Sequence, residues 1–216
     1  KSNISDKTKL IMTAKIKLNA ASGGGSFSLQ APSSSANTRV MTLPDTADGT
    51  ILTTTNPRTG NSLQVVQTVK TDAFTTTSSS LVDVTGMSAT ITPTSTSSKI
   101  LVEVHIGISG GAQYSYAHYV LLRGSTQIGI GTGATGSNQT NISFATNWNT
   151  PNEYIGHAAS FQFLDSPSTT SATTYKLQVK SGYASKALYV NRVNASYDET
   201  YNAKTASTFT LTEVAG

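Results

Sequence analysis

Apolar and polar residues alternate along most of this chain with a period of two, the spacing that places successive side chains on opposite faces of a β-strand. The clearest case is residues 100–108. Its even positions hold Ile100, Val102, Val104, Ile106 and Ile108, and its odd positions hold Leu101, Glu103, His105 and Gly107. This alternation predicts an antiparallel strand with one buried face and one solvent-facing face.

Shorter runs of the same kind predict further strands at 63–69, 81–92, 117–122, 127–131, 140–147, 158–164, 174–180, 187–193 and 207–214. The run 81–92 is expected to form two strands bent at Gly86. Clusters of Ser, Gly and Asn separate the runs, as turns require. Many short strands without a helical period predict an all-β head, an antiparallel β-sandwich resembling a jelly roll, over residues 62–216.

Residues 1–61 have a different pattern. Residues 15–18 alternate like a strand with one wet face, and Gly23-Gly24-Gly25 interrupts the alternation. Short strands are expected at 26–30, 38–43 and 49–54, and Asn56–Asn61 has the Pro, Gly and Asn content of a hinge. We therefore expect an N-terminal anchor and short β-shaft over residues 1–61, ending in this hinge.

The shaft is too poor in apolar residues to fold alone. Between residues 19 and 60 the larger apolar side chains are Phe27, Leu29, Val40, Met41, Leu43, Ile51 and Leu52. Their burial cannot offset the conformational entropy lost on ordering this stretch. It is therefore either a disordered linker or β-structure intertwined with other copies of the chain, and its regular strand–turn spacing favours the second.

Composition removes several function classes. Only 12% of the 216 residues are charged, 29 are Ser and 35 are Thr, and there is no Cys. The absence of Cys excludes disulfides, Cys-ligated zinc and a Cys nucleophile. No apolar run approaches the length that spans a bilayer, so membrane insertion is not expected. The 37% of hydrophobic residues lie in patterned runs, which is not typical of a disordered chain.

The net charge of +4 is concentrated at the N-terminus. Residues 1–44 hold six basic residues and one acid, whereas the rest of the chain is almost neutral. This segment lacks the Arg clusters and interleaved aromatics of a nucleic-acid-binding arm, so no nucleic-acid partner is expected. Instead, we expect it to dock on an acidic protein surface through Lys7, Lys9, Lys15 and Lys17.

The residues that carry chemistry predict neither an enzyme nor a cofactor or metal site. Gly131–Gly136 matches G-x-G-x-x-G, but a strand pattern follows it where a dinucleotide site needs a helix. His105 shares a strand face with Glu103, yet no nucleophile elbow accompanies them. The eleven acids are scattered and lack the paired arrangement that glycan hydrolysis requires. A histidine stacked around a threefold axis could also bind an ion.

Aromatic residues near predicted turns are the best candidates for contact with a host-surface glycan or protein. They are Tyr114, Tyr116, Trp148 and Tyr154, with Asn149 beside the single Trp. An aromatic ring supplies a large contact area, and the neighbouring amide forms hydrogen bonds. The alternative for Trp148 is that its ring folds back and caps the end of the sandwich.

The segment Ser26–Thr55 resembles the fibre shaft of tailed-bacteriophage tail fibres, in which a strand and turn are followed by T-L-P-D-x-x-G-T-x-L. The match runs from Met41-Thr42-Leu43-Pro44-Asp45 to Gly49-Thr50-Ile51-Leu52, with three residues between Asp45 and Gly49 where the pattern has two. The following domain is similar to the trimeric jelly-roll heads of phage structural proteins and of the tumour-necrosis-factor and C1q type. Val82–Met87, Ile91-Thr92-Pro93, Ser98–Val102 and the last strand carry that likeness.

This resemblance implies a homotrimer in the virion, assembled in the host cytoplasm and attached to other virion proteins through its N-terminal segment. It further implies a fibre or spike that binds a receptor, and it supplies no catalytic residue. The shaft is shorter than in long fibres, which leaves open a capsid head fibre or decoration protein with a purely structural role. A glycan-degrading tailspike is the third alternative, with Glu153 and Asp165 as its candidate acids.

Overall fold

The computed structural model describes residues 15–30, 36, 57–111, 113–136, 138–149, 156–183, 186–194, 200 and 202–216. The chain divides into two compact units, Lys1–Ile51 and Leu52–Gly216. The strands expected at 38–43 and 49–54 lie outside the described residues, so they stay predictions.

The described part of the smaller unit is a β-hairpin of β1 (Lys15–Asn19) and β2 (Ser26–Gln30), which pair antiparallel. Gly23 and Gly24 adopt φ values of 85° and 69° in the connection, a conformation that glycine adopts without steric cost. The glycine run that interrupts the alternation is therefore the hairpin turn. Leu18 is 58% exposed on this hairpin, so the hairpin leaves apolar surface uncovered.

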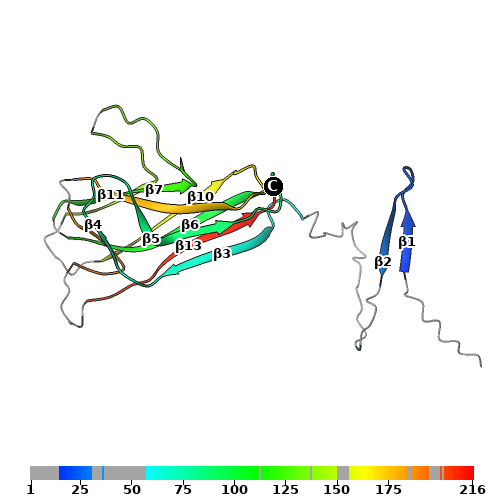
Figure 1. The fold of residues 1–216 in the computed structure, drawn as a ribbon, viewed down its shortest axis with the longest axis horizontal. Helices are drawn as coiled ribbons and strands as arrows, with labels where there is room; N and C mark the ends of the chain where they lie inside the picture. Colours follow the sequence, from blue (N-terminus) through cyan, green and yellow to red (C-terminus); the bar gives the residue numbers. More distant parts are fainter. Residues whose placement is uncertain are drawn as a thin grey trace, which may run out of the picture. The chain divides into compact units, whose positions relative to one another are not determined.

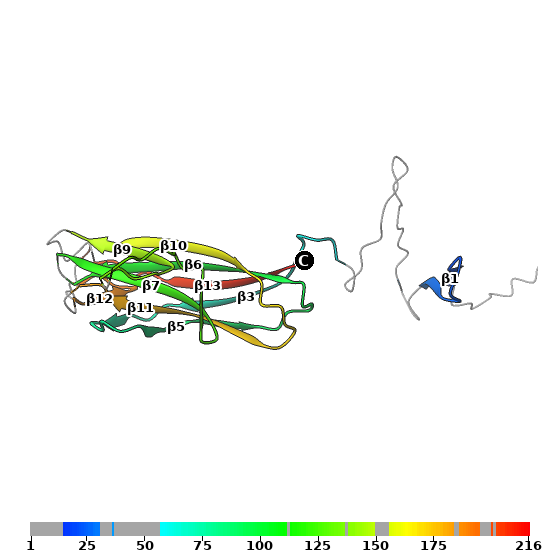
Figure 2. The ribbon, with the colours of Figure 1, turned by 90° about the horizontal axis from the view of Figure 1, so that it is seen from above.

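Two antiparallel sheets form the larger unit (Figures 1 and 2). The first, here called the large sheet, consists of β3 (Ser62–Lys70), β13 (Ser207–Val214), β6 (Lys99–Gly110), β12 (Leu188–Val190), β4 (Phe74–Thr76) and β10 (His157–Asp165). The second sheet consists of β5 (Val82–Ile91), β11 (Thr173–Ser181), β7 (Ser115–Arg123), β8 (Thr126–Ile128) and β9 (Phe144–Trp148). The all-β sandwich prediction is confirmed.

The core lies between the sheets and is built from the alternate positions that the sequence pattern marks. The five even-numbered aliphatic residues of β6 are each at most 2% exposed. They face Tyr175, Leu177 and Val179 of β11 within one apolar cluster. The sandwich therefore follows from period-two burial on both sheets.

Several local details differ from the expectation. The strands expected at 127–131, 140–147 and 187–193 are the shorter β8, β9 and β12, and residues 140–143 are irregular loop. Residues 82–91 form one strand, and the expected bend at Gly86 is a bulge, where φ is 84° and the register against β11 shifts between Lys176 and Gln178. The bulge bends the strand without ending it, because the ladder resumes on both sides. Strand β4 was not expected, since three residues among Ser and Thr show no alternation.

The strand registers define two ends of the sandwich. Val214 pairs with both Lys99 and Ser62, and the amide of Gly60 donates to the carbonyl of Ala215 at 2.8 Å. We call this the proximal end, because the chain arrives there from its N-terminal segment, and Figure 1 shows the C-terminus at the same place. The opposite end, where β6 turns into β7, is the distal end.

Candidate contact site at the distal end

The turn between β6 and β7 is fixed to its neighbours at the distal end. The amide of Gly111 donates to the carbonyl of Ala187 at 2.8 Å, and Asn194 Nδ2 donates to the carbonyl of Gly111 at 2.9 Å. Tyr114 follows in this turn with φ of 64° and 47% of its surface exposed. A bulky side chain in the left-handed region is uncommon and strained. The fold therefore holds an exposed ring in a conformation that an isolated chain avoids.

A second exposed ring lies beside Tyr116. The rings of Tyr116 and Tyr183 meet edge to face with centroids 6.3 Å apart, and Tyr183 is 55% exposed. The amide of Gly182 donates to the carbonyl of Tyr116 at 2.8 Å, and Ser181 Oγ donates to the carbonyl of Tyr183 at 3.3 Å. These bonds extend the pairing of β7 with β11 beyond the strand, so the two rings rest on a fixed backbone.

Two asparagines complete this surface. Asn147 pairs with Tyr116 across β9 and β7, and Asn149 follows β9 and is exposed. We call Tyr114, Tyr116, Tyr183, Asn147 and Asn149 the distal aromatic patch. Sequence reasoning assigns Tyr183 to packing or a subunit interface and not to host contact, because only the β7–β11 pairing brings it to Tyr116. Its one local signal is the turn sequence Ser181-Gly182-Tyr183, which resembles the Tyr-bearing turn before β7.

Trp148 does not belong to the patch. It is 4% exposed, lies in the core cluster and packs 5.9 Å from the ring of His157. A ring buried in this way has no free face for a glycan, so the proposed contact role of Trp148 is corrected to a cap on the distal end of the core. Strand alternation explains the burial, because Trp148 points inward whereas Asn147 points outward.

Several of the predicted residues cannot be compared with the structure. Tyr154, Glu153, Lys7 and Lys9 lie outside the described residues. Lys17 lies on β1 and is exposed, as a docking residue requires. Lys15 is the first residue of the same strand.

Two of the three histidines, His105 and His157, line one cavity on the large sheet, and His118 lies on the second sheet. His105 is exposed on the large sheet, where its Nδ1 lies 2.9 Å from Ser160 Oγ. His118 packs against Gly182 on the second sheet, and burial, followed by the nearby charge of Lys180, lowers its pKa. His157 lies against Trp148. Among the described residues, no three His, Cys, Asp or Glu side chains cluster as a metal site would need.

Asp165, a candidate acid for glycan cleavage, is tied into an ion pair. Arg123 Nη1 donates to both of its carboxylate oxygens at 2.9 Å, and the Tyr175 hydroxyl donates to Oδ2 at 2.7 Å. Burial, followed by this hydrogen bond, raises the pKa of Tyr175. Asp165 is 6% exposed, so its carboxylate is engaged in holding β10 to β7 and β11.

The glycine motif has no helix after it. Residues 131–136 and 138–143 form irregular loop, and β9 follows. A phosphate site of the dinucleotide type needs the amides of a helix N-terminus at this point. The described loop does not supply them.

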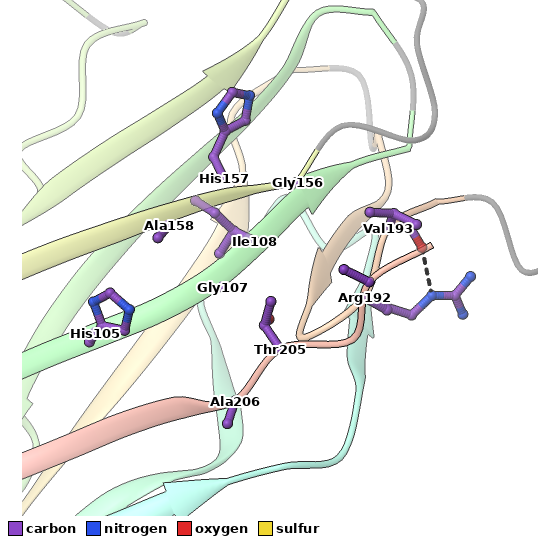
Figure 3. A pocket seen from close by; sticks show the side chains of 11 residues that line it. His105, Gly107, Ile108, Gly156, His157, Ala158, Arg192, Val193, Thr205 and Ala206 are labelled. Atoms are coloured by element: carbon purple, nitrogen blue, oxygen red, sulfur yellow. Dashed lines mark hydrogen bonds between the residues drawn. The ribbon is translucent and has the colours of Figure 1, made fainter. Parts of the chain in front are cut away.

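A cavity of about 360 Å³ lies on the large sheet where the segment before β13 crosses β6 and β10 (Figure 3). Its walls include His105, Gly107, Ala158, Val193 and Thr205. The guanidinium of Arg192 points away from these side chains, and its Nε donates to the carbonyl of Val193 at 3.0 Å. Its Nη2 donates to the carbonyl of Asn194 at 2.9 Å, so this charge is held by backbone.

Comparisons with known proteins give a distant likeness only. No protein-family model matches the chain, and neither does any curated protein. Similar solved structures include the infectious bursal disease virus Gt strain, with a TM-score of 0.38 and 14% identity over 82% of this chain and 43% of that chain. The Gx strain gives 0.35 and 11% identity over 82% of this chain and 42% of that chain. The alignment thus spans less than half of each viral chain.

In the part of the chain that the structure describes, there is no helix with the length and apolar character needed to cross a bilayer.

Proposed function

We propose that this chain is a bacteriophage virion structural protein, a trimeric fibre or spike whose head contacts the host surface. The observation that carries the proposal is the separation of two features at opposite ends of the sandwich. The N-terminal segment joins at the proximal end, where Gly60 bonds to Ala215. The distal aromatic patch lies at the other end, so the chain enters the sandwich at the end opposite the patch.

The chemistry of the patch supports a recognition role. Tyrosines with neighbouring Ser, Gly and Asn are the residues that antibody loops use, since Tyr provides rigid amphipathic area and the small polar residues provide adaptable hydrogen bonds. Here Tyr114 and Tyr183 are exposed, and backbone hydrogen bonds hold the chain near each of them, at Gly111 and at Gly182. A preorganised surface loses little entropy on binding, which favours affinity.

The proposed attachment of the N-terminal segment to the particle rests on the charge of that segment and on its resemblance to fibre shafts. Lys7, Lys9, Lys15 and Lys17 give the segment its positive charge, and we propose that they dock on an acidic surface of the particle. Attraction between exposed charges weakens as salt screens them, so this docking is expected to loosen at high ionic strength. The phage assignment follows the likeness of residues 26–55 to fibre shafts.

The proposal is tested by comparing how the purified wild-type chain and the Tyr114→Gly variant bind to a panel of bacterial cells. Glycine adopts φ of 64° without strain, so this change leaves stability unchanged or raises it by up to about 1 kcal/mol. It also removes the exposed ring, so cell binding is expected to fall while the melting temperature holds. A second variant, Tyr183→Ser, is expected to do the same.

The matched control is Gln127→Ala, at an exposed position of β8. It is expected to leave cell binding unchanged. Wild-type chain that adsorbs to no cell type, or Tyr114→Gly and Tyr183→Ser variants that bind as well as wild type, would remove the attachment role.

A purely structural decoration protein on the capsid is the competing candidate. The burial of Trp148 favours it, because the strongest stacking ring in the chain is unavailable to a partner. It predicts capsid labelling by electron microscopy and infectivity that survives deletion. A glycan-degrading spike draws less support, because Asp165 is already paired with Arg123.

A further inference from the structure

We infer that the distal aromatic patch binds an acidic polysaccharide, and that Lys180, which lies beside the patch, holds the carboxylate or phosphate group of a sugar unit. The inference deepens the proposed function and rests on it, because it names the chemical class of the surface ligand. It follows from the strand registers around Tyr116 and from the way charged side chains are paired in the described part of the head.

Lys180 lies next to the patch on the solvent-facing side of the second sheet. In the register of β11 and β7, Lys180 is opposite His118. Tyr116 lies two residues from His118 on the same face of β7, and it is opposite Asn147 of β9. Opposite residues on one sheet face have Cβ atoms about 4.5–5.5 Å apart, so a ligand that covers the ring of Tyr116 is within reach of the Lys180 amine.

The amine of Lys180 has no counter-ion among the residues that the structure describes. Its Nζ donates to Thr140 Oγ1 at 3.2 Å, in the loop before β9. Lys176, four residues earlier on the same face of β11, pairs with Asp83 at 2.9 Å, and Gln178 Nε2 donates to that carboxylate at 2.7 Å. The acid of this face is therefore engaged with Lys176, whereas Lys180 contacts a neutral hydroxyl.

The other described carboxylates are engaged or lie in other places. They are Asp72 in its ion pair with Lys70, Asp165 in its ion pair with Arg123, Glu213 in its buried position near the proximal end, and Glu103 on the large sheet. A second cation belongs to this region, because the amide of Lys186 donates to the carbonyl of Tyr183 at 3.2 Å. In the described part of the chain, the surface around Tyr116 and Tyr183 thus has two lysines and no carboxylate.

His118 supports the patch without adding charge to it. A Cβ at Gly182 would lie 2.6 Å from both Cε1 and Nε2 of His118, so the imidazole packs directly against the backbone that leads to Tyr183. Burial, followed by the nearby charge of Lys180, lowers the pKa of His118, and its ring is therefore neutral at neutral pH. The positive charge of this surface is that of the lysines.

The groups around Lys180 suit a sugar better than a bare anion. An aromatic ring such as that of Tyr116 offers a flat apolar surface to the C–H face of a pyranose. The amide of Asn147 and the hydroxyl of Thr140 both donate and accept hydrogen bonds, as sugar hydroxyls require. Ala145 is exposed opposite His118, and its small side chain leaves room above the sheet. Because a charge-assisted hydrogen bond is roughly twice as strong as a neutral one, the lysine favours an acidic sugar over a neutral sugar.

Binding of the purified full chain to four immobilised polymers tests the inference. Polygalacturonate presents carboxylates on sugars, a sugar-bearing teichoic acid presents phosphodiesters, dextran is a neutral polysaccharide, and polyglutamate presents carboxylates without sugars. The wild-type chain is expected to bind polygalacturonate or the teichoic acid, and the one that it binds identifies the anionic group. Binding is expected to weaken as salt rises, and dextran and polyglutamate are expected to be bound far more weakly.

Two variants at the site carry the test. Lys180→Gln removes the charge and is expected to weaken binding by about tenfold or more, because hydrogen bonds to charged groups are the stronger ones. Lys180→Arg keeps the charge and is expected to retain most of the binding. Ala145→Glu places a carboxylate beside Lys180 and is expected to weaken binding as Lys180→Gln does. Circular dichroism shows whether each variant keeps its β-structure.

Three exposed positions provide matched controls. Lys99→Gln removes the same charge at the proximal end, and Lys17→Gln removes it from the N-terminal hairpin. Thr174→Glu adds a carboxylate to the same face of the second sheet, but at the opposite end of β11 from Lys180. All three variants are expected to bind the acidic polysaccharide as well as the wild-type chain does.

This inference and the proposed function fail in different ways. A chain that binds neither acidic polysaccharide, that binds dextran or polyglutamate equally well, or that binds unchanged in a folded Lys180→Gln variant overturns the inference. Cell binding that depends on Tyr114 and Tyr183 but not on Lys180 then leaves the attachment role intact with a different ligand. Conversely, an acidic polysaccharide that is bound through Lys180 supports the inference even where no cell type is bound, and the failure belongs to the attachment role alone.

Discussion

Glu213 shows at the scale of one residue how this fold uses a buried charge. Glu213 is fully buried near the proximal end of the sandwich. Thr94 donates to Oε1 of Glu213 from both its amide and its hydroxyl, each at 2.7 Å. Gln64 Nε2 donates to Oε2. Burial raises the pKa of Glu213, but the hydrogen bonds from Thr94 and Gln64 outweigh it and leave the pKa below its ordinary value of 4.5.

Replacement of Glu213 by Gln is expected to destabilise the protein at neutral pH by about 1–3 kcal/mol, because an amide cannot accept on both arms and leaves donors unsatisfied. A carboxyl whose native pKa is depressed stabilises the fold above its unfolded pKa and loses that contribution as pH falls through the native pKa. The difference in unfolding free energy between wild type and Glu213→Gln should therefore shrink below pH 4.5. Urea titrations at several pH values measure it, and a constant difference would contradict this account.

Trp148 shows how far the sequence alone can predict the surroundings of a single residue. Its aromatic and amide setting drew attention to the distal end, and that end does carry exposed tyrosines. Its burial, however, depends on close packing with Gly110 and His157. Both residues lie on other strands, and Gly110 is also distant from Trp148 in the sequence. Strand parity would have placed Trp148 inward once the start of β9 was known. The sequence does not give that start, because the loop before it has no clear pattern.

At the scale of elements, the turn between β6 and β7 depends on the absence of a side chain at Gly110. A Cβ there would lie 2.6 Å from Ser115 Cβ and 3.0 Å from Trp148 Cδ2. Both neighbours are buried, and Ser115 pairs with Trp148 across β7 and β9. A side chain at Gly110 can therefore be accommodated only if β6 moves away from β7 and β9.

Gly110→Ala is expected to destabilise the head by about 1–3 kcal/mol, the range for overpacking a core. Because Trp148 is the single Trp, its fluorescence reports on this change directly. Emission should shift toward the exposed range, with easier quenching. Gly124→Ala tests the specificity of the effect: no heavy atom lies within 4 Å of its Cβ position, and its cost is confined to the positive φ of 59°. Unchanged Trp emission in Gly110→Ala would contradict the close packing.

Alternation predicted the elements well where it was long and poorly where it was short. The strand at 207–214 has the expected bounds, and β6 extends its expected run by one residue at one end and two at the other. Phe74 lies in a three-residue strand that no periodic pattern can reveal, although its ring packs on the core. Which strands become neighbours is a long-range property. For this reason the sequence alone could not predict the strand pairing that brings Tyr116 next to Tyr183.

At the scale of the whole molecule, neither unit covers all of its apolar surface by itself. The hairpin of β1 and β2 leaves Leu18 exposed, and a two-stranded hairpin is marginally stable alone. The large sheet leaves Val65, Val69 and Leu164 exposed on the side away from the core. The homotrimer that we propose would cover part of this surface.

The homotrimer that we propose makes stability depend on protein concentration. A ligand or subunit that binds only the folded state raises the melting temperature by mass action. The melting temperature of the wild-type chain is therefore expected to rise with protein concentration. Differential scanning calorimetry over a wide range of concentration measures this dependence, and a wild-type melting temperature that does not change would mean that each head is stable without its neighbours.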